Sequence, residues 1–144
     1  MSFVYNDGGR ALAGYKGYAG DCVVRAIAIA TNQPYQTVYS DLNSLIKNSR
    51  QSKQTRKSSS RTGMHKKFYI RYLQSLGWKW VSVMKIGTGC KMHLRKEELP
   101  SGRIIARLSQ HLTAVINGII HDVCDPSRGG TRCVYGYWTK KETL

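Results

Sequence analysis

An almost uninterrupted apolar run that begins at Cys22 predicts a buried helix over about residues 21–31. Only Arg25 and Thr31 are polar within that run, and a helix that is apolar on every face is buried. Residues 34–47 and 63–76 instead repeat apolar side chains at three- and four-residue steps, which is typical of amphipathic helices. The first half of the chain is therefore predicted to be helical.

Shorter apolar segments in the second half of the chain predict β-strands. Residues 78–86 alternate between two faces, and residues 103–108 and 133–138 are also expected to be strands. Two further apolar runs, 111–116 and 119–125, are separated only by Asn117-Gly118, which is a strong hairpin signal. Helices followed by an antiparallel sheet predict an α+β fold, and the length of 144 residues predicts a single domain over residues 1–144.

The balance of charge is strongly basic and predicts an acidic partner. The chain has 23 Lys and Arg against 8 Asp and Glu, for a net charge of +15, which favours nucleic acids or acidic proteins as partners. Residues 47–62 contain no acid and are predicted to form a flexible basic loop. This loop is either a solvated linker or a contact for phosphates or an acidic partner. Its candidate contact residues are Lys47, Arg50, Lys53, Arg56, Lys57 and Arg61.

Two absences bear on location and redox state. No apolar run is long enough to span a membrane, and the N-terminus lacks the basic start and apolar stretch of a signal peptide. We therefore expect a cytoplasmic location, which for a viral protein means the host cytoplasm. The four cysteines are then expected to be reduced thiols rather than a disulfide framework.

Two cysteines and two histidines in the second half of the chain could instead form a zinc site. Cys90 and His93, and likewise His121 and Cys124, each place two ligands three residues apart, and together they would form a Cys₂His₂ set. The second pair falls in a predicted strand, where residues 121 and 124 point to opposite faces. We therefore expect no metal and no cofactor.

Cys22 is the candidate nucleophile because it stands at the start of the buried helix. Free backbone N–H groups and the helix dipole favour a thiolate at that position. Asp21 precedes it and is expected to cap the helix through its side chain. Such a carboxylate would raise the pKa of the thiol, so another cation would be needed to activate it. The alternative is a small buried thiol that only packs.

The predicted hairpin brings a base and two carboxylates to its open end. A two-residue turn at 117–118 pairs residue 116 with 119 and, farther along, His111 with Cys124. Asp122 then faces Thr113 on the same side as His111, and Asp125 ends the strand beside it. Either carboxylate is placed to hold an imidazole nitrogen, so the two stay alternatives. A thiol, a base and an orienting acid are the groups that nucleophilic catalysis requires.

These motifs resemble those of the papain-like cysteine peptidase superfamily. Asp21-Cys22 opens the central helix, His111 begins an apolar strand and Asp125-Pro126 closes the next strand. The pattern is most similar to the bacteriocin-leader-processing peptidases, and small phage and bacterial proteins also carry segments that look like the one around Cys22. The resemblance covers about residues 20–31 and 108–128. It implies a papain-like fold, with Cys22 as nucleophile, His111 as general base and then acid, and Asp125 as the orienting group.

One departure from the superfamily concerns the oxyanion. A Gln usually stands about six residues before the nucleophile and donates to the oxyanion, whereas this chain has Lys16 there. The backbone N–H of Cys22 is one candidate donor, and the second is Lys16, Asn6 or a backbone N–H of the Gly-rich segment before Cys22. Losing a good donor typically costs about two to three powers of ten in rate. The departure is compatible with a slow hydrolase and with a fold that has lost catalysis.

Two functions follow from these residues. The first is a thiol hydrolase that cuts a peptide or related amide bond through a thioester at Cys22, with an acidic substrate favoured by the charge of +15. The second is a weak or inactive papain-like fold that binds nucleic acid or an acidic protein with little sequence preference. Its contacts would be the basic loop and the arginines at positions Arg95, Arg103, Arg107, Arg128 and Arg132. We favour the hydrolase.

Overall fold

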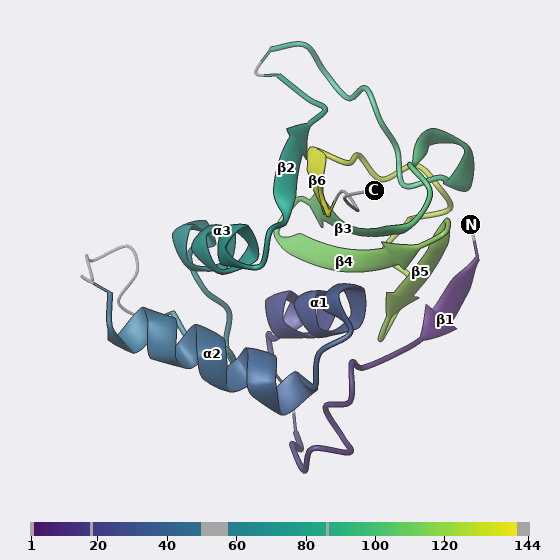
Figure 1. The fold of residues 1–144 in the computed structure, drawn as a ribbon. Helices are drawn as coiled ribbons and strands as arrows, with labels where there is room; N and C mark the ends of the chain where they lie inside the picture. Colours follow the sequence, from purple (N-terminus) through teal and green to yellow (C-terminus); the bar gives the residue numbers. More distant parts are fainter. Residues whose placement is uncertain (1, 18, 50–57, 86, 141–144) are drawn as a thin grey trace.

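Helices pack against one face of a six-stranded sheet (Figure 1), which confirms the α+β class. Helix α1 (Cys22–Thr31) lies against the sheet, and α2 (Tyr35–Lys47) packs on both α1 and α3 (Lys66–Ser75). The three predicted helices are therefore confirmed, with small shifts at their ends. None of the described helices is long and apolar enough to cross a membrane. The computed structural model describes residues 2–17, 19–49, 58–85 and 87–140.

The sheet has the strand order β1-β5-β4-β3-β6-β2. β1 runs parallel to β5, and the other neighbours are antiparallel. The prediction of a purely antiparallel sheet was therefore wrong, because a strand of three residues is too short to show a pattern and forms only by pairing with distant β5. The strands are β1 (Phe3–Tyr5), β2 (Lys79–Ser82), β3 (Arg103–Leu108), β4 (His111–Ile116), β5 (Ile119–Asp122) and β6 (Gly136–Thr139).

Alternation along the central strands gives the sheet an apolar core on each face. Ile105 and Ala114 belong to the cluster that contains the side chains of α1. Ile104 and Val115 belong to a second cluster on the other face. Every residue of α1 from Val23 to Ala30 is buried, so the apolar run correctly predicted a central buried helix.

The hairpin forms in the predicted register but is shorter than expected. Ile116 pairs with Ile119, and Asn117 has the positive φ of 51° that such a tight turn requires. β5 ends at Asp122, so the predicted pairing of His111 with Cys124 does not form. This early end of the strand decides which carboxylate lies beside the imidazole.

The cysteines are not all reduced, contrary to the prediction. Cys90 and Cys133 form a disulfide with a Cα–Cα distance of 5.8 Å, while Cys22 and Cys124 are free. His93 also pairs with Cys133 in an isolated β-bridge, so the segment before η1 (Lys96–Glu98) lies along the approach to β6. The pairing spans 43 residues and depends on this long-range contact, which spacing alone does not reveal.

The end of the predicted basic loop is anchored rather than free. Ser60 is fully buried, its N–H donates to Asn43 Oδ1 over 2.9 Å, and its hydroxyl donates to the Tyr39 carbonyl over 2.8 Å. Ser59 and Gly63 close a short bridge next to it. The description as a flexible loop over 47–62 was therefore wrong for its last residues, and residues 50–57 lie outside the described part of the chain.

Candidate active site

Cys22 is the first residue of α1 and is half-buried at the edge of a cavity of about 670 Å³. The first backbone hydrogen bond of this helix runs from the Arg25 N–H to the Asp21 carbonyl over 3.1 Å. The N–H groups of the residues before Arg25 therefore precede the helical ladder, as at any helix start. The thiol thus lies where the positive end of the helix dipole stabilises a thiolate.

Asp21 does not cap the helix, which corrects the expectation for its side chain. No side-chain cap hydrogen bond is formed at this position. The carboxylate is 1% exposed and is paired with Arg25, lies 3.4 Å from Arg10 Nε, and accepts a hydrogen bond of 2.5 Å from the Tyr35 hydroxyl. Two guanidinium groups therefore neutralise the charge that was expected to oppose ionisation of Cys22.

His111 begins β4 and is held by Asp122, the last residue of β5. Its Nε2 lies 2.7 Å from Asp122 Oδ2, which also accepts a hydrogen bond of 2.8 Å from the Thr113 hydroxyl. The Val123 N–H donates to the other carboxylate oxygen over 2.7 Å. These bonds leave Nδ1 of His111 available to the thiol and fix the plane of the ring.

Asp122, and not Asp125, is the carboxylate that contacts His111. Asp125 accepts a hydrogen bond of 2.9 Å from the Ser127 N–H and makes no hydrogen bond to His111 within the described residues. The geometry therefore contradicts the orienting position that the resemblance implied for Asp125. It supports the alternative, Asp122, which the alternation of side chains along the predicted strand had placed on the same face as His111. The reason is local: the chain leaves the sheet after Asp122, and Asp125 closes the following turn.

Cys22 and His111 shift each other's pKa toward an ion pair. Burial raises the pKa of Cys22, but the hydrogen bond and charge of His111, with the Leu112 N–H and Arg25, lower it overall. Burial lowers the pKa of His111, but hydrogen bonds to Asp122 and Cys22 raise it to about 9. Each group therefore stabilises the charged form of the other, and a thiolate beside an imidazolium is the reactive form of a cysteine.

Arg25 links the helix that begins at Cys22 to the Asp122 carboxylate of the hairpin. Its guanidinium pairs with Asp21 and lies 3.7 Å from Asp122 Oδ1. The side chain is 11% exposed, so both pairs are protected from solvent screening. Arg25 thus ties the element that carries Cys22 to the residue that holds His111, a role that the apolar pattern of the helix did not indicate.

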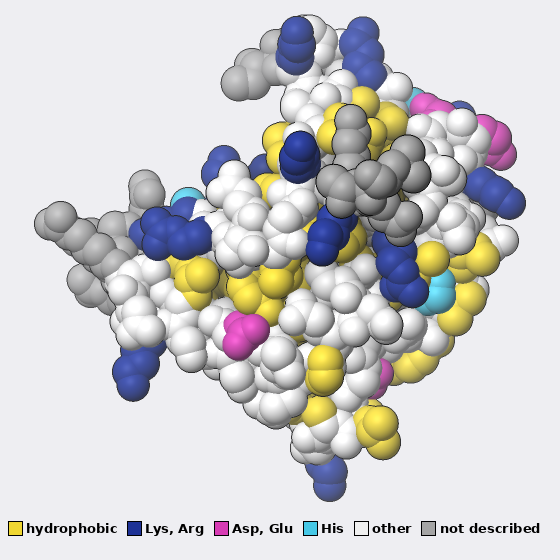
Figure 2. Space-filling model, viewed as in Figure 1, with side chains coloured by type: hydrophobic (Ala, Val, Ile, Leu, Met, Phe, Trp, Pro, Cys, Tyr) yellow, Lys and Arg dark blue, Asp and Glu magenta, His cyan; other side chains and the backbone are white. Residues whose placement is uncertain are grey.

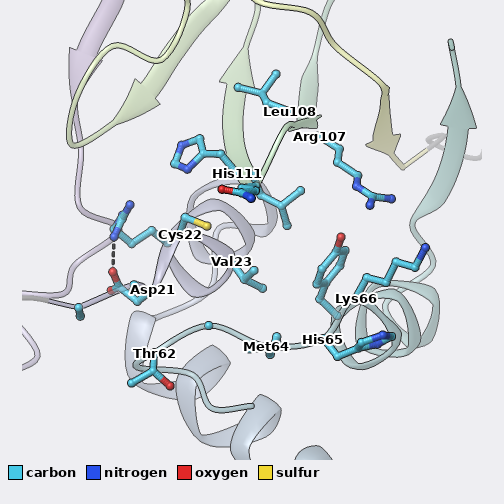
Figure 3. A pocket seen from close by; sticks show the side chains of 17 residues that line it. Asp21, Cys22, Val23, Thr62, Met64, His65, Lys66, Arg107, Leu108 and His111 are labelled. Atoms are coloured by element: carbon cyan, nitrogen blue, oxygen red, sulfur yellow. Dashed lines mark hydrogen bonds and ion pairs between the residues drawn. The ribbon is translucent and has the colours of Figure 1, made fainter. Parts of the chain in front are cut away.

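The cavity beside Cys22 is lined by residues from three stretches of the chain, within 19–25, 62–69 and 107–112 (Figure 3). Thr62 and Met64 form one side, and Lys66 and Arg107 lie across from the thiol. Thr62 lies close to the segment before Cys22, since a Cβ added at Gly20 would be only 3.1 Å from the Thr62 carbonyl oxygen. The anchored end of the basic loop therefore forms part of the site.

Neither of the two residues predicted by name as the second oxyanion donor, Lys16 and Asn6, lines this cavity. Lys16 is exposed, and its carbonyl accepts from Arg10 and Arg61, while the Asn6 amide lies 3.3 Å from His121 Nδ1. Gln110, which the sequence interpretation missed, does line the cavity. The sequence feature that could have indicated Gln110 is the gap of two residues between the strands predicted over 103–108 and 111–116. This gap forms a tight turn just before His111.

Three of the four residues of the zinc alternative have other partners. Cys90 is in the disulfide, His93 Nδ1 lies 3.3 Å from Glu98, and His121 contacts Asn6. Within the described residues, no group of three or more His, Cys, Asp or Glu side chains is arranged to hold a metal ion.

Basic side chains are spread widely over the surface, and acidic ones are few on the face shown in Figure 2. Of the loop candidates, Lys47 is exposed at the end of α2 and Arg61 donates to the Lys16 carbonyl over 3.0 Å. Arg50, Lys53, Arg56 and Lys57 lie outside the described residues. Three of the arginines proposed as contacts instead donate to backbone carbonyls: Arg95 to Gly130, Arg103 to Ile29 and Arg132 to Ser109.

Comparisons of the chain with protein-family models, with curated proteins and with solved structures find no match.

Proposed function

We propose that this protein is a papain-like cysteine hydrolase that cleaves a peptide or related amide bond. The observation that supports this most directly is the arrangement of Cys22, His111 and Asp122 at one cavity, with 2.7 Å between His111 Nε2 and Asp122 Oδ2. A nucleophile needs an adjacent base, and the base needs a group that holds its orientation. Each of these three side chains comes from the start or end of a different element.

The reaction proceeds in two steps on these residues. The Cys22 thiolate attacks the carbonyl carbon, and the Cys22 backbone N–H with the Gln110 side chain donates to the oxyanion. The C–N bond breaks, the imidazolium of His111 gives its proton to the leaving amine, and a thioester forms. His111 then takes a proton from water as the water attacks the thioester. The carbon–sulfur bond breaks, and the acid product and the thiolate are released.

Selective alkylation of Cys22 tests this proposal. An ordinary thiol is only about 0.3% ionised at about pH 6, so a thiolate stabilised by His111 stands out there. We expect iodoacetamide to modify Cys22 about tenfold or more faster than Cys124 at that pH, although Cys124 is the exposed thiol. Mass spectrometry of the digested protein gives both rates in one sample.

His111→Ala is the variant that connects this reactivity to the site. It should remove the selectivity, because the imidazolium is the main group that lowers the pKa of Cys22 against the effect of burial. His121→Ala is a matched control, since His121 contacts Asn6 and not the thiol. Cys22 reacting no faster than Cys124 in the unmodified protein would rule out the activated nucleophile.

The alternative function, binding of nucleic acid or an acidic protein without catalysis, is supported by the net charge of +15. It predicts a gel shift with a single-stranded or duplex oligonucleotide whose affinity falls steeply with salt. Binding that survives Cys22→Ala but is lost when the cations of residues 47–62 are neutralised would favour this alternative.

A further inference from the structure

A second hollow of about 280 Å³, lined by residues of α3, β2, β3 and β6, adjoins the cavity beside Cys22. Lys66, Tyr69 and Arg107 line both hollows, so these three residues stand where the two meet. The second hollow adds Trp80 and Trp138. We refer to the two adjoining hollows together as the groove; it extends from the side of the thiol toward Trp80 in β2.

This groove is positively charged and has no acid to balance it. Neither Lys66 nor Arg107 forms an ion pair within the described residues. No acidic residue lines the second hollow, and the one acid at the first hollow is Asp21, which is buried against Arg25 and Arg10. Two uncompensated cations in a partly enclosed space favour an anionic ligand.

One buried donor on a residue that lines the groove lacks an acceptor among the described residues. The indole Nε1 of Trp138 is buried, on a side chain that is 2% exposed, and has no hydrogen-bond partner in the described structure. Tyr69 is 6% exposed as a whole; its hydroxyl bonds to no described residue but, unlike the Trp138 Nε1, is not a fully buried atom. Burial raises the pKa of Tyr69, Arg107 lowers it and the charge of Cys22 raises it, with a net rise, so the hydroxyl keeps its proton. Buried donors without acceptors are uncommon because each is costly.

We propose that the groove formed by Lys66, Tyr69, Arg107, Trp80 and Trp138 is a subsite for an acidic side chain of the substrate, close to the bond that Cys22 attacks. The inference rests on the proposed hydrolase function and names its substrate class. A carboxylate has two oxygens that accept from several donors at once, and Arg binds it through two parallel bonds. Trp80, 37% exposed and 5.5 Å from the Trp138 ring, offers an apolar surface for the neighbouring residue.

An acidic peptide fits this subsite better than a nucleic acid does. Tyr69 is only 6% exposed, so its hydroxyl is reached by a slender carboxylate side chain more readily than by a phosphate that carries a sugar on each side. The groove also starts at the nucleophile, where a bound peptide would present its amide bond.

Matched peptides test the proposal. In a set of fluorogenic peptides, Glu is placed in turn at each position flanking the bond to be cut, and each peptide is paired with one that carries Gln there. We expect the Glu peptide at one position to be cleaved with a kcat/KM about tenfold or more above its Gln partner, because hydrogen bonds to charged groups are stronger than neutral ones. Equal cleavage of every pair would overturn the subsite.

Variants of Arg107 then locate the preference. Arg107→Gln should reduce the ratio to about onefold to threefold, and Arg107→Lys should keep part of it because the charge is retained. Lys91→Gln is the matched control, since Lys91 is exposed and lines neither hollow. A Glu preference that survives Arg107→Gln unchanged would also overturn the subsite.

Two further measurements separate this proposal from the hydrolase itself. Alkylation of Cys22 in the unmodified protein reports on the nucleophile without any peptide. Binding of the same peptides to Cys22→Ala, followed by tryptophan fluorescence, reports on the subsite without catalysis, and Glu should bind about tenfold more tightly than Gln. An oligonucleotide that binds Cys22→Ala through Arg107 and displaces the Glu peptide would assign the groove to nucleic acid instead.

Discussion

Replacing Asp122 by Asn removes one charge from the site while keeping the size of the side chain. In the native protein Asp122 accepts hydrogen bonds from His111, Thr113 and the Val123 N–H. Asn keeps an oxygen for some of these donors but no longer stabilises the imidazolium by charge. The thiolate of Cys22 depends on that imidazolium, so the effect of the substitution should appear at the sulfur.

The size of the effect follows from the pKa of His111. Its rise from 6.5 to about 9 corresponds to about 3 kcal/mol in favour of the protonated ring, at about 1.4 kcal/mol for each tenfold change. Asp122 and Cys22 share this stabilisation. A share of this for Asp122 is on the order of 1–2 kcal/mol, or a loss of thiolate of roughly five- to thirtyfold below neutral pH.

The assay is the rate of Cys22 alkylation against pH. The carboxylate of Asp122 stabilises imidazolium, and imidazolium stabilises thiolate, so Asp122→Asn raises the pH at which alkylation reaches half its maximum. The cleavage rate should fall in parallel. At alkaline pH the two proteins should converge, because the thiol then ionises without help from His111.

Asp125→Asn is the control, because it makes the same chemical change three residues away at a side chain that bonds to Ser127 and not to His111. It should leave the pH profile unchanged. A profile that shifts with Asp125→Asn and not with Asp122→Asn would refute the assignment of Asp122, and unchanged profiles in both variants would mean that no carboxylate orients His111.

Two predictions concern stability. Arg25→Met leaves the buried carboxylates of Asp21 and Asp122 without their shared cation; we expect about 3 kcal/mol less free energy of unfolding in urea, and a loss below about 1 kcal/mol would show that the other partners of the two acids suffice. The double substitution Cys90→Ser and Cys133→Ser removes a disulfide between residues 43 positions apart, and it should lower the free energy of unfolding by about 2–4 kcal/mol. Thiol titration of the unreduced native protein should detect two free cysteines and not four.

Patterns within a few residues of one another were enough to predict the three α-helices and every described strand except β1. The apolar run after Cys22 predicts the buried helix, and Asn117-Gly118 predicts the hairpin and its register, because helix and hairpin periods follow from backbone geometry alone. That register also placed Asp122 opposite Thr113 and on the side of His111. Cys22 and His111 were therefore recognisable as candidates before any tertiary contact was known.

Tertiary structure decided what surrounds those candidates. Asp122 rather than Asp125 holds His111 because β5 ends where the chain turns away from the sheet. Asp21 pairs with arginines instead of capping its helix, and Cys90 meets Cys133 across 43 residues. Such contacts form between segments that are far apart in the sequence, and the spacing of residues within one segment does not predict them. The helix that begins at Cys22 was evident in the sequence, whereas the groove of Arg107 and Trp138 beside it exists only once α3 and β6 have packed together.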